Sequence, residues 1–130
     1  RIRTMFCSAE GKTERMRCML PAMNIVEPSL QGLLLLDWTA KGECAKHREF
    51  LVGWSHRALG NLERWMAGRQ FVATDEFTVA DILMAHVLRG VQDSTLLAPY
   101  PGLVAYRDRC LARPAWQRTI EAYCARVEAA

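Results

Sequence analysis

A helix-start signal in the second half of the chain limits the possible folds more than any other feature. The Thr78 hydroxyl can accept a hydrogen bond from the amide of Asp81, and the Asp81 carboxylate can reach back to the amide of Thr78. This pairing is a capping box, here with Asp in place of the commoner Glu. Phe77 before the cap and Ile82 after the box have the spacing of a hydrophobic staple. The residues up to Leu88 are almost all apolar, which predicts a helix at the centre of a bundle.

Asp81 also has a second interpretation, since an acidic side chain among apolar residues can mark a catalytic site. Its position three residues after Thr78 is accounted for in full by the capping box. We therefore interpret Asp81 as structural, and we assign no catalytic residue in this chain.

The rest of the sequence also favours helices. Alternating runs of Val, Ile and Thr are missing, and so are the Asn-Gly and Asp-Gly pairs of hairpin turns. Ala, Leu, Arg, Glu and Met, which favour helices, are plentiful. The predicted fold class is all-α, with residues 1–130 as one helical domain.

The first helical region is expected to begin near Ser8 or Thr13 and to run to about Thr39. Pro21 and Pro28 are the points where it must bend or break. Proline donates no backbone hydrogen bond, and its ring crowds the preceding turn.

After Gly42 the sequence predicts a long amphipathic helix that ends near Gly68. Its apolar residues recur at three- and four-residue steps and form one stripe: Leu51, Trp54, Ala58, Leu62 and Trp65. The opposite face is charged, with Lys46, Glu49, Arg57 and Arg64.

Two shorter helices complete the expected fold. The first is entered through Pro101 and broken before Pro114, and the second runs from about Ala115 to Val127. The side chains expected to face inward are Leu103, Tyr106, Cys110, Trp116, Ile120 and Tyr123.

Composition and charge exclude several function classes. The net charge is only +3, with basic and acidic residues interspersed, so nucleic-acid binding has no support. No run of about 18 uncharged apolar residues exists that could cross a bilayer, so no membrane partner is expected. The leucines at positions 33–36 are therefore interpreted as buried core. No secretory signal opens the sequence, and we expect a cytoplasmic protein.

The cysteines and histidines indicate neither disulfides nor a metal site. Five cysteines are an odd number without a C-x-x-C pair, which favours reduced thiols. Cys18, next to Arg17, is the best candidate for a reactive thiol, but an ordinary helix-face cysteine is the simpler interpretation. His47, His56 and His86 lack the i, i+4 spacing of a two-histidine zinc site.

The order of these elements resembles a known family. A buried helix with a capping box follows a long amphipathic helix and precedes two further motifs. These motifs read Leu97, Ala98, Pro99, Tyr100, Pro101, Gly102, Leu103, and then Arg109 through to Arg113, Pro114 and Ala115. Together they resemble the C-terminal domain of bacterial cytosolic glutathione S-transferases, over nearly the whole chain from Thr13 onward.

The resemblance implies a division of labour. In that family an N-terminal thioredoxin-like domain supplies the Ser, Tyr or Cys that acts on the glutathione thiol. No strand-helix-strand segment precedes residue 10, so we expect that domain to be absent from this chain. The helical domain would shape the pocket for a small hydrophobic electrophile, chiefly with its first helix, and supply much of a homodimer interface. Glutathione would be the co-substrate of the full-length protein, and no cofactor is expected in this chain.

Two polar residues in the first helix are candidates for that pocket. Asn24 and Glu27 lie among apolar neighbours, and their spacing of three puts them on one helix face. We predict that they bind substrate or the dimer partner. Alternatively, they satisfy backbone groups freed by Pro28.

Methionines and tryptophans give further candidates, because thioethers and indoles adapt to varied apolar shapes. Trp54, Trp65 and Met84 are interpreted as core. Four others fit a substrate pocket and the core equally well: Met16, Met19, Met23 and Trp116.

The leading hypothesis is therefore the electrophile-binding and dimerisation domain of a glutathione S-transferase. Its full-length form would conjugate glutathione to an electrophilic carbon, and the isolated domain would be inactive. The alternatives are a non-catalytic glutathione S-transferase-like interaction module and a stand-alone helical bundle that binds a small apolar ligand.

Overall fold

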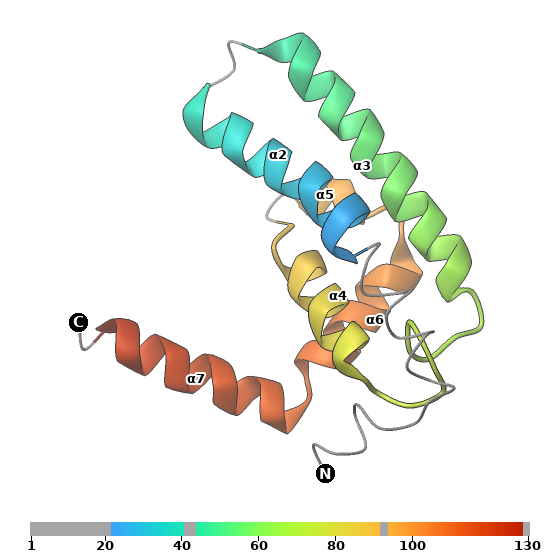
Figure 1. The fold of residues 1–130 in the computed structure, drawn as a ribbon, viewed down its shortest axis with the longest axis vertical. Helices are drawn as coiled ribbons and strands as arrows, with labels where there is room; N and C mark the ends of the chain where they lie inside the picture. Colours follow the sequence, from blue (N-terminus) through green and yellow to red (C-terminus); the bar gives the residue numbers. More distant parts are fainter. Residues whose placement is uncertain (1–21, 41–43, 92–93, 129–130) are drawn as a thin grey trace.

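The computed structural model describes residues 22–40, 44–91 and 94–128 of the chain. These residues form a short π-helix and α-helices, and no strand occurs among them, which confirms the all-α prediction. The elements are η2 (Ala22–Val26), α2 (Glu27–Thr39), α3 (Ala45–Met66), α4 (Val79–Arg89), α5 (Ser94–Leu97), α6 (Pro101–Leu111) and α7 (Pro114–Glu128). Figure 1 shows α2 and α3 side by side and antiparallel, while α7 extends away from the other helices.

The expected bend at Pro28 is present. Because Pro28 donates no backbone hydrogen bond, the chain takes a wider π-helical turn over η2, and α2 then begins with Pro28 in its first turn, where proline is tolerated. The Ser29 hydroxyl donates to the carbonyl oxygen of Val26 at 2.9 Å. The second expected bend, at Pro21, lies outside the described residues.

Helix α2 packs against α3 through a close approach at Gly32. A Cβ atom at Gly32 would lie 3.2 Å from Cδ2 of Leu51. Leu33 is buried, but Leu34 and Leu35 are exposed, so the prediction that all four leucines are core is wrong. The reason is that α2 is an outer helix, and only the side that faces its neighbours is covered.

The apolar stripe of α3 is confirmed for Leu51, Ala58 and Leu62, which are buried. Trp54 is half-buried and packs against the edge of the core. The prediction for Trp65 is wrong, because its side chain is 38% exposed. Trp65 lies in the last turn of α3, and its ring extends over the following loop, where Nε1 donates to the carbonyl oxygen of Val72 at 2.8 Å.

The end of α3 follows the prediction. The helix stops at Met66, and Gly68 has a φ of 73°, a left-handed conformation that glycine adopts without strain. The loop that follows leads to Thr78, the N-cap of α4.

Helix α4 packs on α6 and η2 and is buried over most of its surface. Met84 is 1% exposed, which confirms it as core, whereas His86 and Arg89 are exposed along one side. The buried residues of the helix are Ala80, Asp81, Met84, Ala85, Val87 and Leu88.

The last two helices differ sharply in burial. Leu103, Tyr106 and Cys110 of α6 are buried as predicted. Helix α7 buries no residue: Trp116 and Ile120 are half-buried, and Tyr123 is 65% exposed. The inward prediction is therefore wrong for Tyr123 and holds only in part for the other two, because α7 packs on α6 near its start and then leaves the bundle (Figure 1).

Candidate functional site

Two adjoining hollows lie along α2, next to the C-terminal end of α4. Their volumes are about 110 Å³ and about 140 Å³, and Leu30, Leu34 and Gly90 line both. Further apolar lining comes from Leu33 and Val52 in the smaller hollow and from Val87 in the larger. Both hollows are open to solvent, and the larger one approaches the volume of about 150 Å³ that holds benzene in an enclosed cavity.

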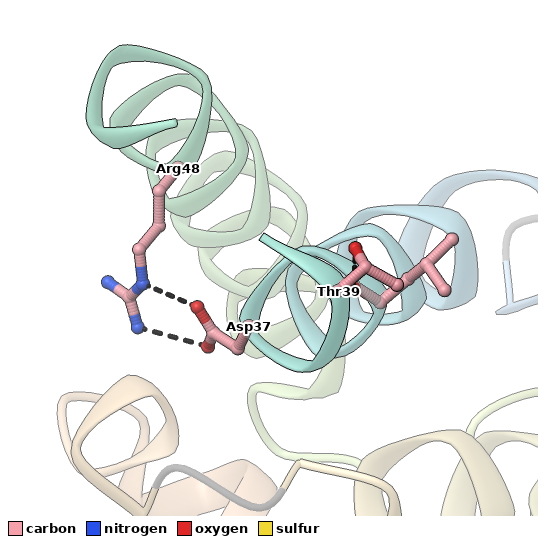
Figure 2. Close-up of polar contacts among 4 residues, drawn as sticks. Asp37, Thr39 and Arg48 are labelled. Carbon is pink, nitrogen blue, oxygen red and sulfur yellow. Dashed lines mark hydrogen bonds and ion pairs between the residues drawn. The ribbon is translucent and has the colours of Figure 1, made fainter. Parts of the chain in front are cut away.

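An ion pair between α2 and α3 is part of the lining of the smaller hollow. Nε of Arg48 lies 2.9 Å from Oδ1 of Asp37, and Nη2 lies 3.3 Å from Oδ2 (Figure 2). Asp37 is in the last turn of α2, where a lone carboxylate is unfavourable beside the negative end of the helix, and Arg48 offsets that charge. Both side chains are more than two-fifths exposed, so the pair stabilises the fold by at most about 1 kcal/mol.

The larger hollow has a polar end made by Glu27, Gln31 and His86. Nε2 of Gln31 donates to Oε1 of Glu27 at 2.9 Å. Glu27 is the first residue of α2, which continues directly from η2. This end can therefore offer hydrogen-bond acceptors beside an apolar lining.

The structure brings together only some of the predicted pocket residues. Glu27 lines the larger hollow, while Met23 and Asn24 are exposed on η2 just before it. Trp116 lies on α7, which is apart from η2 and α2 in Figure 1. Met16 and Met19 lie outside the described residues. The lining residues Leu30 and Leu34 were not among the candidates, because helical spacing does not distinguish a groove wall from core.

The alternative role for Asn24 and Glu27 is to satisfy backbone groups freed by Pro28. The side-chain hydrogen bond to backbone next to the proline is made by Ser29, at Val26. Within the described residues the Glu27 side chain bonds Gln31, and no backbone bond is made by Asn24 or Glu27 side chains. The two residues remain predictions for the pocket.

The capping box is present and belongs to a larger buried network. Oδ2 of Asp81 accepts the Thr78 amide at 2.8 Å and the Thr78 hydroxyl at 3.1 Å. Oδ1 accepts the Val72 amide at 2.8 Å and the Tyr106 hydroxyl at 2.9 Å. Asp81 is fully buried, and this single carboxylate joins the loop before α4, α4 itself and α6.

Two groups at this network, Tyr106 and Cys110, have raised pKa values. Burial, with the Asp81 charge as the next cause, raises the pKa of Tyr106. Burial and then the same charge raise the pKa of Cys110 to about 11. Both groups are therefore neutral at pH 7, which supports a structural interpretation of Asp81 and gives neither neighbour the character of a nucleophile.

Phe77 packs at the edge of this network. Its ring meets Phe71 edge-on, with centroids 5.9 Å apart, and the Arg113 guanidinium lies 3.8 Å above it. Phe77 and Ile82 are both half-buried. The staple between these two residues stays a prediction.

Comparison with known families decides the identity of the fold. The family model described as "Glutathione S-transferase, C-terminal domain" matches residues 45–114, more than half of the chain. The chain belongs to the glutathione S-transferase family. The matched part of this glutathione S-transferase domain runs from α3 to the start of α7 and contains the capping box.

Solved bacterial structures share the fold of this glutathione S-transferase domain. A glutathione transferase from Burkholderia graminis, with two glutathione molecules bound per subunit, is 25% identical with a TM-score of 0.78, over 85% of this chain and 50% of its own. A family member from Pseudomonas fluorescens Pf-5, with two glutathione bound, is 22% identical with a TM-score of 0.77, over 86% of this chain and 52% of its own. A Pseudomonas putida transferase, with one glutathione disulfide bound per subunit, is 22% identical with a TM-score of 0.74, over 84% and 50%.

The glutathione S-transferase domain described here spans about half the length of those solved relatives. No curated protein matches its sequence. Among the described residues, no helix is long and apolar enough to cross a bilayer, and no group of three His, Cys, Asp or Glu side chains is placed to hold a metal ion.

Proposed function

We propose that this chain is the electrophile-binding and dimerisation domain of a glutathione S-transferase. The full-length protein would join the glutathione sulfur to an electrophilic carbon of a small hydrophobic substrate. Family membership and the glutathione carried by the solved relatives support the reaction class.

The observation that carries the proposal is the larger hollow along α2. It combines an apolar lining with the Glu27 and Gln31 end, and its volume approaches that of an enclosed cavity that holds benzene. Met23 and Asn24 are exposed on η2, which directly precedes α2 in the chain. An electrophile held here would be presented to a sulfur nucleophile, which turns an encounter in solution into a nearly intramolecular step.

In this proposal a thioredoxin-like domain activates glutathione. A thiolate attacks far better than a thiol, so that domain lowers the thiol pKa while the helical domain holds the electrophile. The chain alone is then inactive and needs no cofactor. Incubating it with glutathione and a chlorodinitrobenzene should give no conjugate above the uncatalysed rate, and clear turnover would contradict this division of labour.

We also place the protein in the cytoplasm. Cys44, Cys110 and Cys124 are free thiols in the described part of the chain, and a reducing compartment keeps thiols in that state.

Binding of an aromatic compound to the chain tests whether the larger hollow is the electrophile site. Titration of the isotope-labelled chain with nitrobenzene, an unreactive analogue of aromatic electrophiles, should shift the NMR signals of Gly90 and Val87. Leu34→Asp should weaken binding about tenfold, because it removes an apolar wall worth roughly 1.5 kcal/mol.

Leu35→Asp is the matched control, since Leu35 is also exposed on α2 but lines neither hollow. It should bind nitrobenzene as the unchanged chain does. Equal loss in both variants, or no shift at Gly90 at all, would remove the hollow as the electrophile site and favour the non-catalytic interaction module.

A further inference from the structure

Two carboxylates line the hollows along α2, and they differ in how their charge is compensated. Asp37, in the smaller hollow, accepts two hydrogen bonds from the Arg48 guanidinium, at 2.9 and 3.3 Å (Figure 2). Glu27, in the larger hollow, accepts one hydrogen bond from the neutral amide of Gln31, at 2.9 Å. Among the described residues no Lys, Arg or His side chain forms an ion pair with Glu27. Glu27 therefore brings an uncompensated negative charge to its hollow.

The Glu27 carboxylate also has acceptor capacity left. A carboxylate can accept up to about four hydrogen bonds, and Glu27 accepts one within the described part of the chain. Its side chain is half-buried beside the apolar lining that Leu30, Leu34 and Val87 provide. A ligand in the hollow displaces water from this carboxylate, which is unfavourable if the ligand offers no donor. A ligand with a donor replaces the lost water by a charge-assisted hydrogen bond.

Glu27 and part of the apolar lining lie on one side of α2. Glu27, Leu30 and Leu34 are three and four residues apart, a spacing that puts them on the same side of an α-helix. Leu30 lies only about 4.5 Å from Glu27 along the helix axis, because an α-helix rises about 1.5 Å per residue. One aromatic ring against the leucines can therefore place a ring substituent at the carboxylate.

We propose that Glu27 makes the larger hollow selective for aromatic electrophiles that carry a hydrogen-bond donor, a hydroxyl or an amino group, on the ring. The inference rests on the proposed electrophile site and names its substrate class. The same charge disfavours aromatic compounds with an anionic substituent, because that substituent would lie beside a second negative charge without a cation between them.

Three unreactive aromatic compounds test this selectivity. The compound 4-nitrotoluene has a methyl group without a donor, 4-nitroaniline has an amino donor of similar size at the same position, and 4-nitrobenzoate has an anion there. Dissociation constants come from titrations of the isotope-labelled chain, followed at the NMR signals of Gly90 and Val87. The chain should bind 4-nitroaniline about fivefold more tightly than 4-nitrotoluene, and 4-nitrobenzoate at least fivefold more weakly.

Glu27→Gln keeps the shape of the side chain and removes its charge. The preference for 4-nitroaniline over 4-nitrotoluene should fall to about twofold, because a hydrogen bond to a neutral acceptor is about half as strong. Binding of 4-nitrobenzoate should become at least threefold tighter. The two ligands thus respond in opposite directions, whereas a distorted hollow would weaken the binding of all three compounds together.

Two further variants separate Glu27 from other charges. Glu49→Gln removes the same charge from an exposed position on α3 that lines neither hollow, and it should leave all three dissociation constants unchanged. His86→Gln replaces the other ionisable side chain at this end of the hollow. Whatever its effect on the individual constants, it should keep the fivefold ratio between 4-nitroaniline and 4-nitrotoluene.

Three results would overturn the inference. These are equal affinity of the unchanged chain for 4-nitroaniline and 4-nitrotoluene, a preference that Glu27→Gln leaves at fivefold, and a preference lost with His86→Gln or Glu49→Gln. If nitrobenzene still shifts the signal of Gly90, each of these results removes the role of Glu27 alone. If none of the aromatic compounds shifts that signal, the proposed electrophile site fails and the inference fails with it.

Discussion

At the scale of single residues, the two buried serines of the α2–α3 pair have opposite energetics. The Ser29 hydroxyl donates to Val26, whereas Oγ of Ser55 is fully buried and has no hydrogen-bond partner in the described structure. A buried polar atom without a partner loses its hydrogen bonds to water on folding and makes none within the protein, which lowers the free energy of unfolding.

Ser55→Ala should therefore leave the free energy of unfolding unchanged or raise it by up to about 1 kcal/mol, as measured by urea denaturation. Ser29→Ala is the matched control and should lower it by about 1 kcal/mol, because it deletes a hydrogen bond. A clear loss of stability with Ser55→Ala would show that the hydroxyl has a partner in solution.

Cys110 predicts how stability depends on alkaline pH. Its thiol has a pKa of about 11 in the folded chain and an ordinary value of 9.0, so between these two values only the unfolded chain has lost the proton. The contribution of Cys110 to the free energy of unfolding should be fully present below pH 9 and should be lost as the pH rises towards 11, because deprotonation favours the unfolded state.

Cys110→Ala should flatten the fall between about pH 9 and 10, above which Tyr106, whose pKa is also raised, adds to it. The substitution also removes packing and lowers stability at every pH. Cys124→Ala, at an exposed position on α7, should keep the slope of the unchanged chain. Urea denaturation at a series of alkaline pH values measures both slopes, and equal slopes for the two variants would rule out Cys110 as the cause.

At the scale of elements, the start of α6 depends on a residue from α3. The side chain of Tyr100, the N-cap residue of α6, makes no capping hydrogen bond. Instead Oε1 of Glu63 accepts the Gly102 amide at 2.9 Å, and Oε2 accepts the Leu103 amide at 2.8 Å. The carboxylate thus satisfies amides that the first turn of a helix leaves free and also neutralises the positive end of α6.

Position 102 lies against the same carboxylate. A Cβ there would lie 2.7 Å from Oε1 of Glu63, so the flexible end of that side chain would have to move. Gly102→Ala should lower the free energy of unfolding by at most about 1 kcal/mol, because the displaced carboxylate caps α6 less well. In a Glu63→Ala background the same substitution should cost nothing or stabilise by up to about 1 kcal/mol, because Ala is the better helix former. Additive effects in urea denaturation of the single and double variants would contradict the cap.

At the scale of the whole molecule, hydrogen bonds between residues close in sequence could be predicted from the sequence. Contacts between residues far apart in sequence could not. The Thr78 and Asp81 pairing spans three residues, so the pattern alone predicts it. The Tyr106 hydroxyl reaches Asp81 from 25 residues away, and Glu63 reaches the amide of Gly102 from 39 residues away. Such contacts depend on how helices cross, which helical periodicity does not determine.

The same limit explains the errors on burial. Periodicity identifies the apolar side of a helix, but it does not show whether another element covers that side. Tyr123 and Trp65 have the correct spacing for core and are nevertheless exposed, because α7 leaves the bundle and Trp65 lies over the loop that follows α3. The candidate site was predictable only in part. Glu27 could be selected as a polar residue among apolar ones, but the hollow that it lines is formed by α2 and α4 together.

The shared carboxylate of Asp81 has a consequence for how the domain opens. The loop at Val72, the start of α4 at Thr78 and the α6 side chain of Tyr106 all donate to it. If one of these segments unfolds locally, the buried carboxylate loses a hydrogen-bond donor. This loss lowers the stability of the other two segments as well. The three segments are therefore expected to melt as one cooperative unit, and partial unfolding should begin instead in α7.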